Sequence, residues 1–244
     1  MFPTMGQENE NFLNMDLQIP SKKTRKETNL KLLKSGVVLI DPDTTFISPD
    51  TKISKGSKIY PYTFILGKSE IGGNSKIGPN SLITDSKIGS ETEIIYSVIE
   101  ESEVSSGVSV GPFSHLRPKT FVESKVRIGN FAEIKNSKIG EGSEIGHHCY
   151  IGDANLGRRV NVGAGTITAN FDGVKKHQTE IADKVFLGSN TVLVAPVKIG
   201  EEAKTGAGAV VINDLPPNSL SVGVPAKVIK IKGKRVKTSE NIDL

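Results

Sequence analysis

The chain has 244 residues, of which 36% are hydrophobic but only 5% aromatic, and it contains 25 glycines and no tryptophan. Its net charge of +4 is mild, and it lacks the basic stripe with stacking aromatics that nucleic-acid binding needs. A lone cysteine excludes an internal disulfide, and neither a long apolar run nor a signal peptide is recognisable. We therefore expect a cytoplasmic protein with no nucleic-acid or membrane partner, and a core filled by Ile, Val and Leu.

The N-terminal part of the chain shows no hydrophobic periodicity. Residues 1–27 are predicted to be disordered or a linker. The segment TNLKLLKS, residues 28–35, favours a short helix that has Thr28 as its N-cap and ends at Gly36. Residues 28–46 are thus predicted to form a short helix and a lead-in.

From Ile47 onward, an aliphatic residue recurs every six positions, with occasional five-residue steps. The main series are Ile47, Ile53, Ile59, Ile65, Ile71, Ile77 and Ile83, then Val104, Val110, Leu116, Val122, Ile128 and Ile134, and later Ile181, Leu187, Leu193, Ile199, Thr205 and Val211. A six-residue step is typical of a parallel β-helix, in which three short strands, roughly 18 residues, complete a coil. The sequence predicts an all-β domain of roughly nine coils over residues 47–225, with a basic tail over 226–244. A last strand within 219–231 is expected to cover its open end.

In such a fold, residues one coil apart lie on neighbouring rungs about 4.8 Å apart. Arg117 and Lys135 differ by 18 positions and should stack. Two stacked cations either bind an anion such as a phosphate between them or splay into solvent. Five-residue steps shorten two later coils to 17 residues, which places His147 between Asn130 and Ala164 at an exposed corner.

An exposed imidazole can be neutral at pH 7 and accept a proton, so His147 is either a general base or an idle surface residue. Its neighbour His148 is expected on the other face, and Cys149 is interpreted as a small packing residue. Ser189 and Ala207 form a column of small residues that either lines an extended ligand or only serves the turns. The four histidines do not fall at offsets that suit a metal site, so no metal is expected.

Two runs, GHHCYIGDA (146–154) and NVGAGTITANFDG (161–173), carry a resemblance to a known family. They closely resemble the acetyltransferase half of the bacterial bifunctional N-acetylglucosamine-1-phosphate uridyltransferase / glucosamine-1-phosphate acetyltransferases, and the similarity extends from about Asn29 to about Pro225. The resemblance implies a left-handed parallel β-helix, whereas general crossover rules alone favour right-handed turns. It also implies a homotrimer with active sites between subunits, and acetyl-CoA as co-substrate for N-acetylation of glucosamine 1-phosphate.

The same resemblance assigns roles residue by residue. It implies that His147 is the general base and that Arg117 and Lys135 hold the sugar phosphate. Around the sugar it implies Tyr150, Asn161 and Lys176. Along the acetyl-CoA groove it implies Ala164, Asn170, Phe171, Ser189 and Ala207.

Three departures from the family pattern keep alternatives open. Phe171 stands where the family usually has Tyr, and Gly223 stands where it has Arg, so CoA phosphates would be bound more weakly or by the Lys-rich tail. The glycine-rich signature of the family's uridyltransferase domain is not found, so uridyl transfer is not expected, and a separate uridyltransferase becomes a possible partner. Acylation of another amino-sugar or a nucleotide-sugar, and a non-catalytic trimeric scaffold, both remain alternatives.

Overall fold

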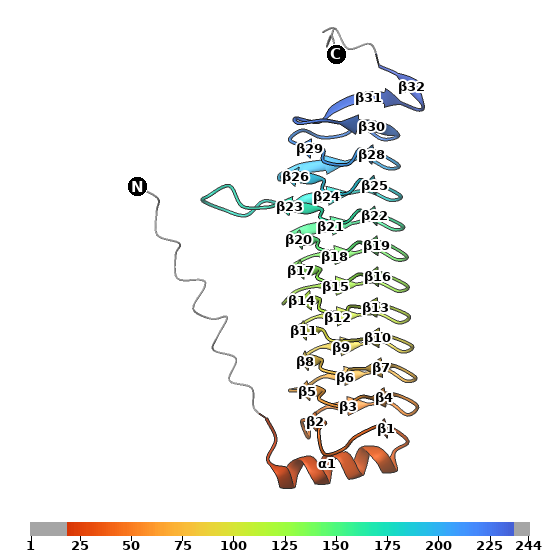
Figure 1. The fold of residues 1–244 in the computed structure, drawn as a ribbon, viewed down its shortest axis with the longest axis vertical. Helices are drawn as coiled ribbons and strands as arrows, with labels where there is room; N and C mark the ends of the chain where they lie inside the picture. The colour runs from red at the N-terminus through yellow and green to blue at the C-terminus, as the bar shows by residue number, and fades with distance from the viewer. Residues whose placement is uncertain (1–18, 237–244) are drawn as a thin grey trace.

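The computed structural model describes residues 19–236, which form a tall prism of stacked coils above a single helix (Figure 1). Three parallel sheets make its sides, because each coil contributes one short strand to each sheet. The coils wind in the left-handed sense that the resemblance implies, so the fold is the expected left-handed parallel β-helix. Residues 1–18 of the predicted linker and residues 237–244 of the basic tail lie outside the described residues.

Up to β29, each sheet takes every third strand of the chain. Sheet A contains β1 (Val38–Leu39), β4 (Lys58–Ile59), β7 (Lys76–Ile77), β10 (Glu93–Ile94), β13 (Ser109–Val110), β16 (Arg127–Ile128), β19 (Glu144–Ile145), β22 (Asn161–Val162), β25 (Phe186–Leu187), β28 (Lys204–Thr205), β30 (Ser219–Val222), β31 (Lys227–Ile231) and β32 (Lys234–Arg235). Sheet B contains β2 (Phe46–Ile47), β5 (Phe64–Leu66), β8 (Leu82–Thr84), β11 (Val98–Glu100), β14 (His115–Leu116), β17 (Glu133–Lys135), β20 (Tyr150–Gly152), β23 (Ile167–Ala169), β26 (Val192–Val194) and β29 (Val210–Val211). Sheet C contains β3 (Lys52–Ile53), β6 (Glu70–Ile71), β9 (Lys87–Ile88), β12 (Glu103–Val104), β15 (Phe121–Val122), β18 (Lys138–Ile139), β21 (Ala154–Leu156), β24 (Thr179–Ile181) and β27 (Val197–Ile199).

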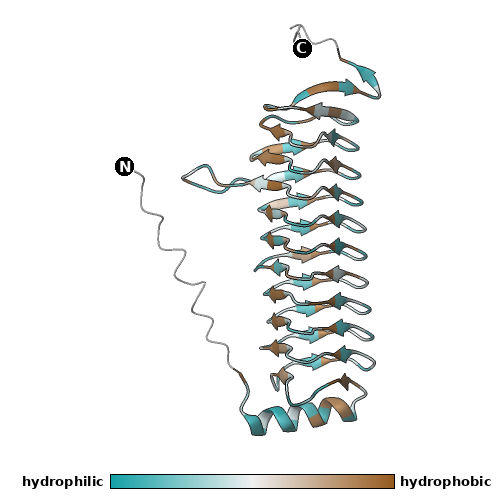
Figure 2. Ribbon diagram, viewed as in Figure 1, coloured by the Kyte–Doolittle hydropathy of each residue, from teal (hydrophilic) through white to brown (hydrophobic). Residues whose placement is uncertain are grey.

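The aliphatic positions of the six-residue pattern fill the centre of the prism. Residues such as Ile47, Ile134 and Leu187 are completely buried, and their columns run the length of the core. Figure 2 shows the same alternation of hydrophobic and hydrophilic residues in coil after coil. The ten strands of sheet B are separated by nine coil steps, in agreement with the prediction.

The helix differs from its prediction at its start. Helix α1 (Lys22–Lys34) begins six residues before Thr28, and its N-cap is Ser21, whose hydroxyl accepts a hydrogen bond from the Thr24 amide. Thr28 is instead buried within the helix, together with Asn29. The Asn29 amide nitrogen donates to the carbonyl oxygens of Pro42 and Thr45, at 2.8 and 3.1 Å. The helix is longer than its apolar pattern suggests, and it covers the open end of the first coil (Figure 1).

The other end of the prism is closed by the last three strands. Strand β30 continues sheet A in parallel, and β31 and β32 then pair with it and with each other in antiparallel fashion. The closing strand predicted within residues 219–231 is therefore present. The part of the basic tail up to Arg235 belongs to this small sheet and is not a free end.

One coil is longer than the others. Asn161 of β22 pairs with Phe186 of β25, 25 residues later, because residues 170–178 leave the prism between β23 and β24. This segment, which we call the arm, projects sideways from the stack in Figure 1.

Candidate functional site

His147 lies at the corner where sheet A turns into sheet B. The pairing of Ile145 with Ile128 below and with Val162 above places Asn130 under His147 and Ala164 over it, as predicted. The His147 side chain is exposed. The imidazole is therefore available to a ligand that lies along this corner.

Above His147, the positions aligned with it at this corner carry small residues. The strand registers align Ala164 with Ser189, Ser189 with Ala207, and Ala207 with Gly223. Gly163, which precedes Ala164, packs so closely that an added Cβ would lie 2.6 Å from the Ser189 amide nitrogen. The predicted column of small residues is therefore present, and it runs from His147 towards the C-terminal sheet.

His148 does not point to the other face, so that expectation was wrong. It has a φ of 57°, its ring stacks on Phe131 with centroids 5.0 Å apart, and it meets the His147 ring edge-on at 5.7 Å. Side chains alternate across a strand only while the backbone stays extended, and a left-handed residue at a corner breaks this alternation. Cys149 is buried, and burial raises the pKa of its thiol, in agreement with a packing role.

A cluster of three cations lies at the opposite edge of sheet B. Arg117 and Lys135 are aligned by the pairing of Leu116 with Ile134, as predicted. The arm brings Lys176, 41 residues further along the chain, close enough to Lys135 to act on its charge. Burial lowers the pKa of Lys135, and the Lys176 ammonium and the Arg117 guanidinium lower it further. A partly buried cation beside two others is a site that favours a bound anion.

Glu133 is an acidic member of this edge that the sequence analysis missed. One of its carboxylate oxygens lies 2.7 Å from the Arg117 guanidinium nitrogen Nη1. Glu133 is also the register partner of Tyr150. The 16-residue offset between Arg117 and Glu133 was available in the sequence as a signal for this pair.

Tyr150 reaches from β20 towards the cations. A Cβ added at Gly152 would lie 2.4 Å from the Tyr150 hydroxyl oxygen and 2.8 Å from the Asn170 amide nitrogen. Gly152 thus leaves the space in which the Tyr150 hydroxyl and the Asn170 side chain meet, next to its register partner Lys135. Tyr150 therefore lies beside the cations as the resemblance implies, whereas Asn170, which the resemblance assigns to the acetyl-CoA groove, lies with Tyr150 and not in the column above His147.

The predicted residues do not all converge within one chain. His147 precedes Gly152 by five residues, so its corner and the cation cluster are at most about 18 Å apart along sheet B. Asn161 lies on sheet A, where it pairs with Glu144 and Phe186, and not beside Tyr150 on sheet B. A single chain therefore provides two half-sites at the two edges of one face.

The arm that carries Phe171 and Lys176 is a small hairpin. Phe171 and Lys176 form an antiparallel bridge, and 58% of the Phe171 surface is exposed. Asp172 stabilises the tip of the hairpin. One of its carboxylate oxygens accepts hydrogen bonds from the backbone amides of Val174 and Lys175. The other oxygen lies 2.6 Å from the His177 nitrogen Nε2. The Lys175 amide and then the His177 ring hold the pKa of Asp172 well below its usual range.

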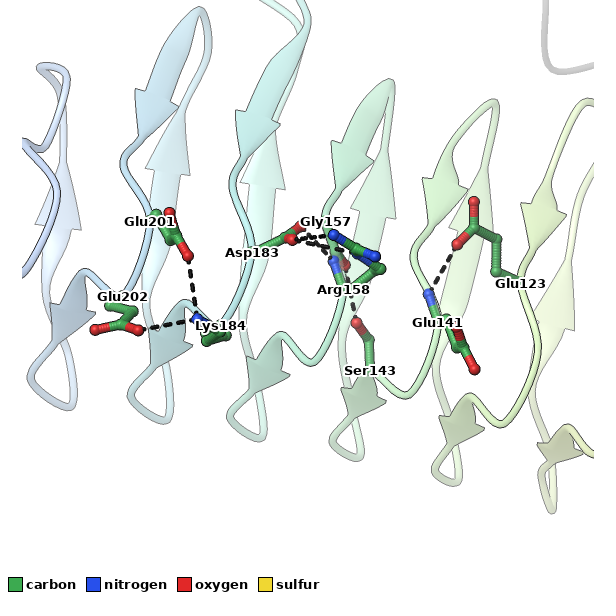
Figure 3. A network of polar contacts seen from close by, with 9 residues as sticks. All are labelled: Glu123, Glu141, Ser143, Gly157, Arg158, Asp183, Lys184, Glu201 and Glu202. Atoms are coloured by element: carbon green, nitrogen blue, oxygen red, sulfur yellow. Dashed lines mark hydrogen bonds and ion pairs between the residues drawn. The ribbon is translucent and has the colours of Figure 1, made fainter.

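The third corner, between sheets C and A, carries a second charged cluster (Figure 3). Arg158 contacts Asp183 at 3.1 Å, and Lys184 contacts Glu201 and Glu202 at 3.2 and 3.1 Å. Because these cations already have acidic partners, the cluster is a surface network and not a second anion site. None of the predicted site residues belongs to it.

Residues 19–236 contain neither a metal-binding cluster nor a membrane-spanning helix. No group of three or more His, Cys, Asp or Glu side chains in this range is arranged to hold a metal ion. Its one helix is too short and too polar to span a membrane.

Comparison with known proteins supplies the family context. Residues 98–204 match the family described as the GMPPB C-terminal domain. A bifunctional protein GlmU from Thermosipho africanus is 52% identical over 208 residues, which cover 85% of this chain and 46% of that protein. The chain is a homologue of GlmU proteins. A GlmU protein from Thermotoga maritima is 50% identical over 200 residues, or 82% of this chain and 45% of its own length.

The chain therefore spans about half the length of the GlmU proteins that it matches. Among solved structures, a UDP-N-acetylglucosamine acyltransferase from Francisella novicida is 20% identical, with a TM-score of 0.44 over 78% of this chain and 68% of that one. The sequence similarity to GlmU extends over more than four-fifths of the chain. It therefore confirms the family resemblance that residues 146–173 indicate.

Proposed function

We propose that this chain is an acetyltransferase that moves the acetyl group of acetyl-CoA to the amine of glucosamine 1-phosphate. The observation that carries this proposal is the cation cluster of Arg117, Lys135 and Lys176 on the same face as His147, in a chain about half identical to GlmU over the matched residues. A sugar phosphate has an anion that can bind to these cations and an amine that an imidazole can deprotonate. In this proposal, the phosphate binds to the cations and the amine lies next to His147, at the two edges of sheet B.

In this mechanism, the cations bind the phosphate and thereby fix the position of the amine. The neutral imidazole of His147 accepts a proton from the amine as its nitrogen attacks the thioester carbon. The carbon–sulfur bond then breaks, and the CoA sulfur leaves as a thiolate that takes up a proton. No acyl-enzyme is needed, because both substrates are held together in one site.

The acetyl-CoA arm is assigned to the corner above His147. Ala164, Ser189 and Ala207 form a track of small side chains beside which backbone groups stay accessible to an extended ligand. This track leads towards the last sheet, where Lys227, Lys230 and Lys234 lie on β31 and β32. We assign the CoA phosphates to these lysines, since Gly223 takes the place of the family's arginine.

We further propose that the active unit is a homotrimer in which a neighbouring copy joins the two half-sites. An exposed ladder of Tyr96, Phe113 and Phe131 runs beside sheet B, with successive ring centroids 5.4 Å apart. These rings are 40, 55 and 48% exposed, and an apolar ladder of this kind is typical of a protein interface. Phe171 lies exposed on the projecting arm and can reach such a copy. A cytoplasmic location and a separate uridyltransferase partner remain predictions of this proposal.

The test is CoA thiol release from acetyl-CoA with purified chain and one of three acceptors. Glucosamine 1-phosphate should give turnover, and glucosamine without phosphate should give far less because it cannot use the cations. Equal rates for the two would contradict the phosphate assignment. UDP-glucosamine is the third acceptor, because Phe171 replaces a tyrosine at the site, and a preference for it would favour the nucleotide-sugar alternative. No release with any amine would favour the scaffold.

A further inference from the structure

Both ends of the arm are hydrogen-bonded to Asp153. Neither the resemblance nor the proposed mechanism gives this residue a role. It lies at the corner between sheets B and C with a φ of 48°, directly after β20. Asn136, one coil below, occupies the same corner with a φ of 46°. Asn and Asp tolerate this left-handed conformation better than other residues with a Cβ, so the corner itself explains their type but not their contacts.

Both ends of the arm are bonded to Asp153. At the outgoing end, the Asn170 amide nitrogen donates to the Asp153 carboxylate oxygen Oδ2 in a very short contact. At the returning end, the backbone amide of Thr179 donates to the Asp153 carbonyl oxygen at 3.1 Å. Asn170 is 7% exposed and Thr179 is fully buried, so these bonds are shielded from water.

The second carboxylate oxygen ties Asp153 to the coil below. The Asn136 amide nitrogen donates to Oδ1 at 2.5 Å, and the Asp153 amide donates to the Lys135 carbonyl oxygen at 3.1 Å. One side chain therefore accepts from two amide groups, one on each neighbouring coil. A carboxylate can accept at both oxygens, whereas an asparagine has only one acceptor oxygen and would turn its own amide towards a donor.

We propose that Asp153 is a positioning residue that fastens the arm and thereby holds Lys176 beside Lys135 and Arg117. These three cations repel one another, so a loose arm would swing Lys176 away when no anion is bound. The negative charge of Asp153 also acts directly on Lys135. It raises the pKa of Lys135 and so opposes the lowering caused by burial and by the two neighbouring cations. Asp153 thus bonds to both ends of the arm and also interacts with Lys135 of the cation cluster. The kinetic part of this inference rests on the proposed acetyl transfer, and the structural part does not.

The first measurement needs no activity. Lys175 and Lys176 are exposed trypsin sites on the arm, so limited trypsin digestion of the full chain reports how often the arm opens. Asp153→Asn should speed cleavage at these sites about tenfold, because a charge-assisted hydrogen bond is lost. The double variant Asp153→Asn/Asn170→Asp restores an amide-to-carboxylate bond with the partners exchanged, and it should return cleavage close to the original rate. Cleavage of Asp153→Asn at the original rate, or no rescue by the exchanged pair, would overturn the proposal.

Asp85 supplies the matched control. It occupies the corner between sheets B and C in an earlier coil, with a φ of 45°, and its carboxylate accepts from the Lys68 amide at 2.9 Å. Asp85→Asn changes the same residue type in the same conformation far from the arm. It should leave cleavage of the arm and turnover unchanged, and faster cleavage of the arm in this variant would show that any weakened corner loosens the coils.

The second measurement separates positioning from general damage. In Asp153→Asn, KM for glucosamine 1-phosphate should rise about tenfold while kcat falls much less, because Lys176 binds the phosphate and does not take part in the chemistry. A fall in kcat with unchanged KM would contradict this role. If the unmodified chain shows no acetyl transfer, the proposed function fails while the trypsin result still decides whether Asp153 fastens the arm.

Discussion

The hydroxyl of Tyr150 lies directly over Gly152, two residues further along the same strand. The space for a methyl group at Gly152 is taken by the Tyr150 oxygen, at 2.4 Å from the ideal Cβ position, and by the Asn170 amide nitrogen, at 2.8 Å. Both obstacles are side-chain ends, and Gly152 does not have a positive φ. The glycine is therefore required by the side chains of the site and not by the fold of the strand.

Gly152→Ala should consequently damage the site more than the fold. We expect the Tyr150 ring to move away from the cations, and KM for glucosamine 1-phosphate to rise about tenfold while the melting temperature changes little. The comparison variant is Tyr150→Ala, because Gly152→Ala should have little further effect once the ring is gone. Additive effects of the two substitutions on KM would show that the glycine acts by another route.

His147 and His148 provide a paired test of the proposed base. His147→Ala should lower kcat by about 10²–10⁴ with little effect on folding, since an exposed general base is removed. His148→Ala should cost far less turnover, although it removes a ring that stacks on Phe131. Equal losses of kcat in the two variants would remove the assignment of His147.

Much of this arrangement followed from the sequence, for a physical reason. The six-residue step fixes which residues point inward, and the strand registers then follow by counting, which placed Ala164 over His147 and Lys135 over Arg117 correctly. Counting failed where the backbone leaves the repeat. The orientation of His148 depends on a left-handed φ, and the meeting of Lys176 with Lys135 depends on how the arm folds back, which no fixed period encodes. The contacts of Asp153 with Asn136 and Asn170, in contrast, fall at offsets of 17 residues, one shortened coil, so counting could have found them.

Lys135 predicts an unusual dependence of stability on pH. Its pKa is lowered from 10.5 by burial and by Lys176 and Arg117. Between this lowered pKa and about 10.5, the unfolded chain binds more protons than the folded one, so stability should rise with pH across this interval. Below it, the charged Lys135 is a cost, and Lys135→Met should raise the stability of the ligand-free protein at pH 7 by at most about 1 kcal/mol.

A bound anion offsets the unfavourable free energy of the charged Lys135 beside Lys176 and Arg117. Inorganic phosphate should raise the melting temperature at pH 7, and the increase should fade as Lys135 loses its proton at alkaline pH. Lys135→Met should abolish most of the increase, whereas Lys87→Met, which removes a lysine 3.8 Å from Glu103 on sheet C, should not. An equal response to phosphate in all three proteins would contradict an anion site at Lys135.

The core of the prism contains a buried threonine, Thr205, where the repeat predicts an aliphatic side chain. Thr205 occupies an inward position that the six-residue pattern fills with an aliphatic residue in most coils, so replacement by Val would restore the pattern. The Thr205 hydroxyl, however, accepts from the buried Gly188 amide at 3.0 Å and lies 2.8 Å from the Thr191 hydroxyl. Thr205→Val leaves the Gly188 amide without its side-chain acceptor, and we expect a loss of about 1–3 kcal/mol in the free energy of unfolding. Thr205→Ser keeps the hydroxyl and should lose less, so denaturant unfolding of both variants separates the hydrogen bond from the packing. A Val variant as stable as the original protein would show that core hydrophobicity outweighs this bond.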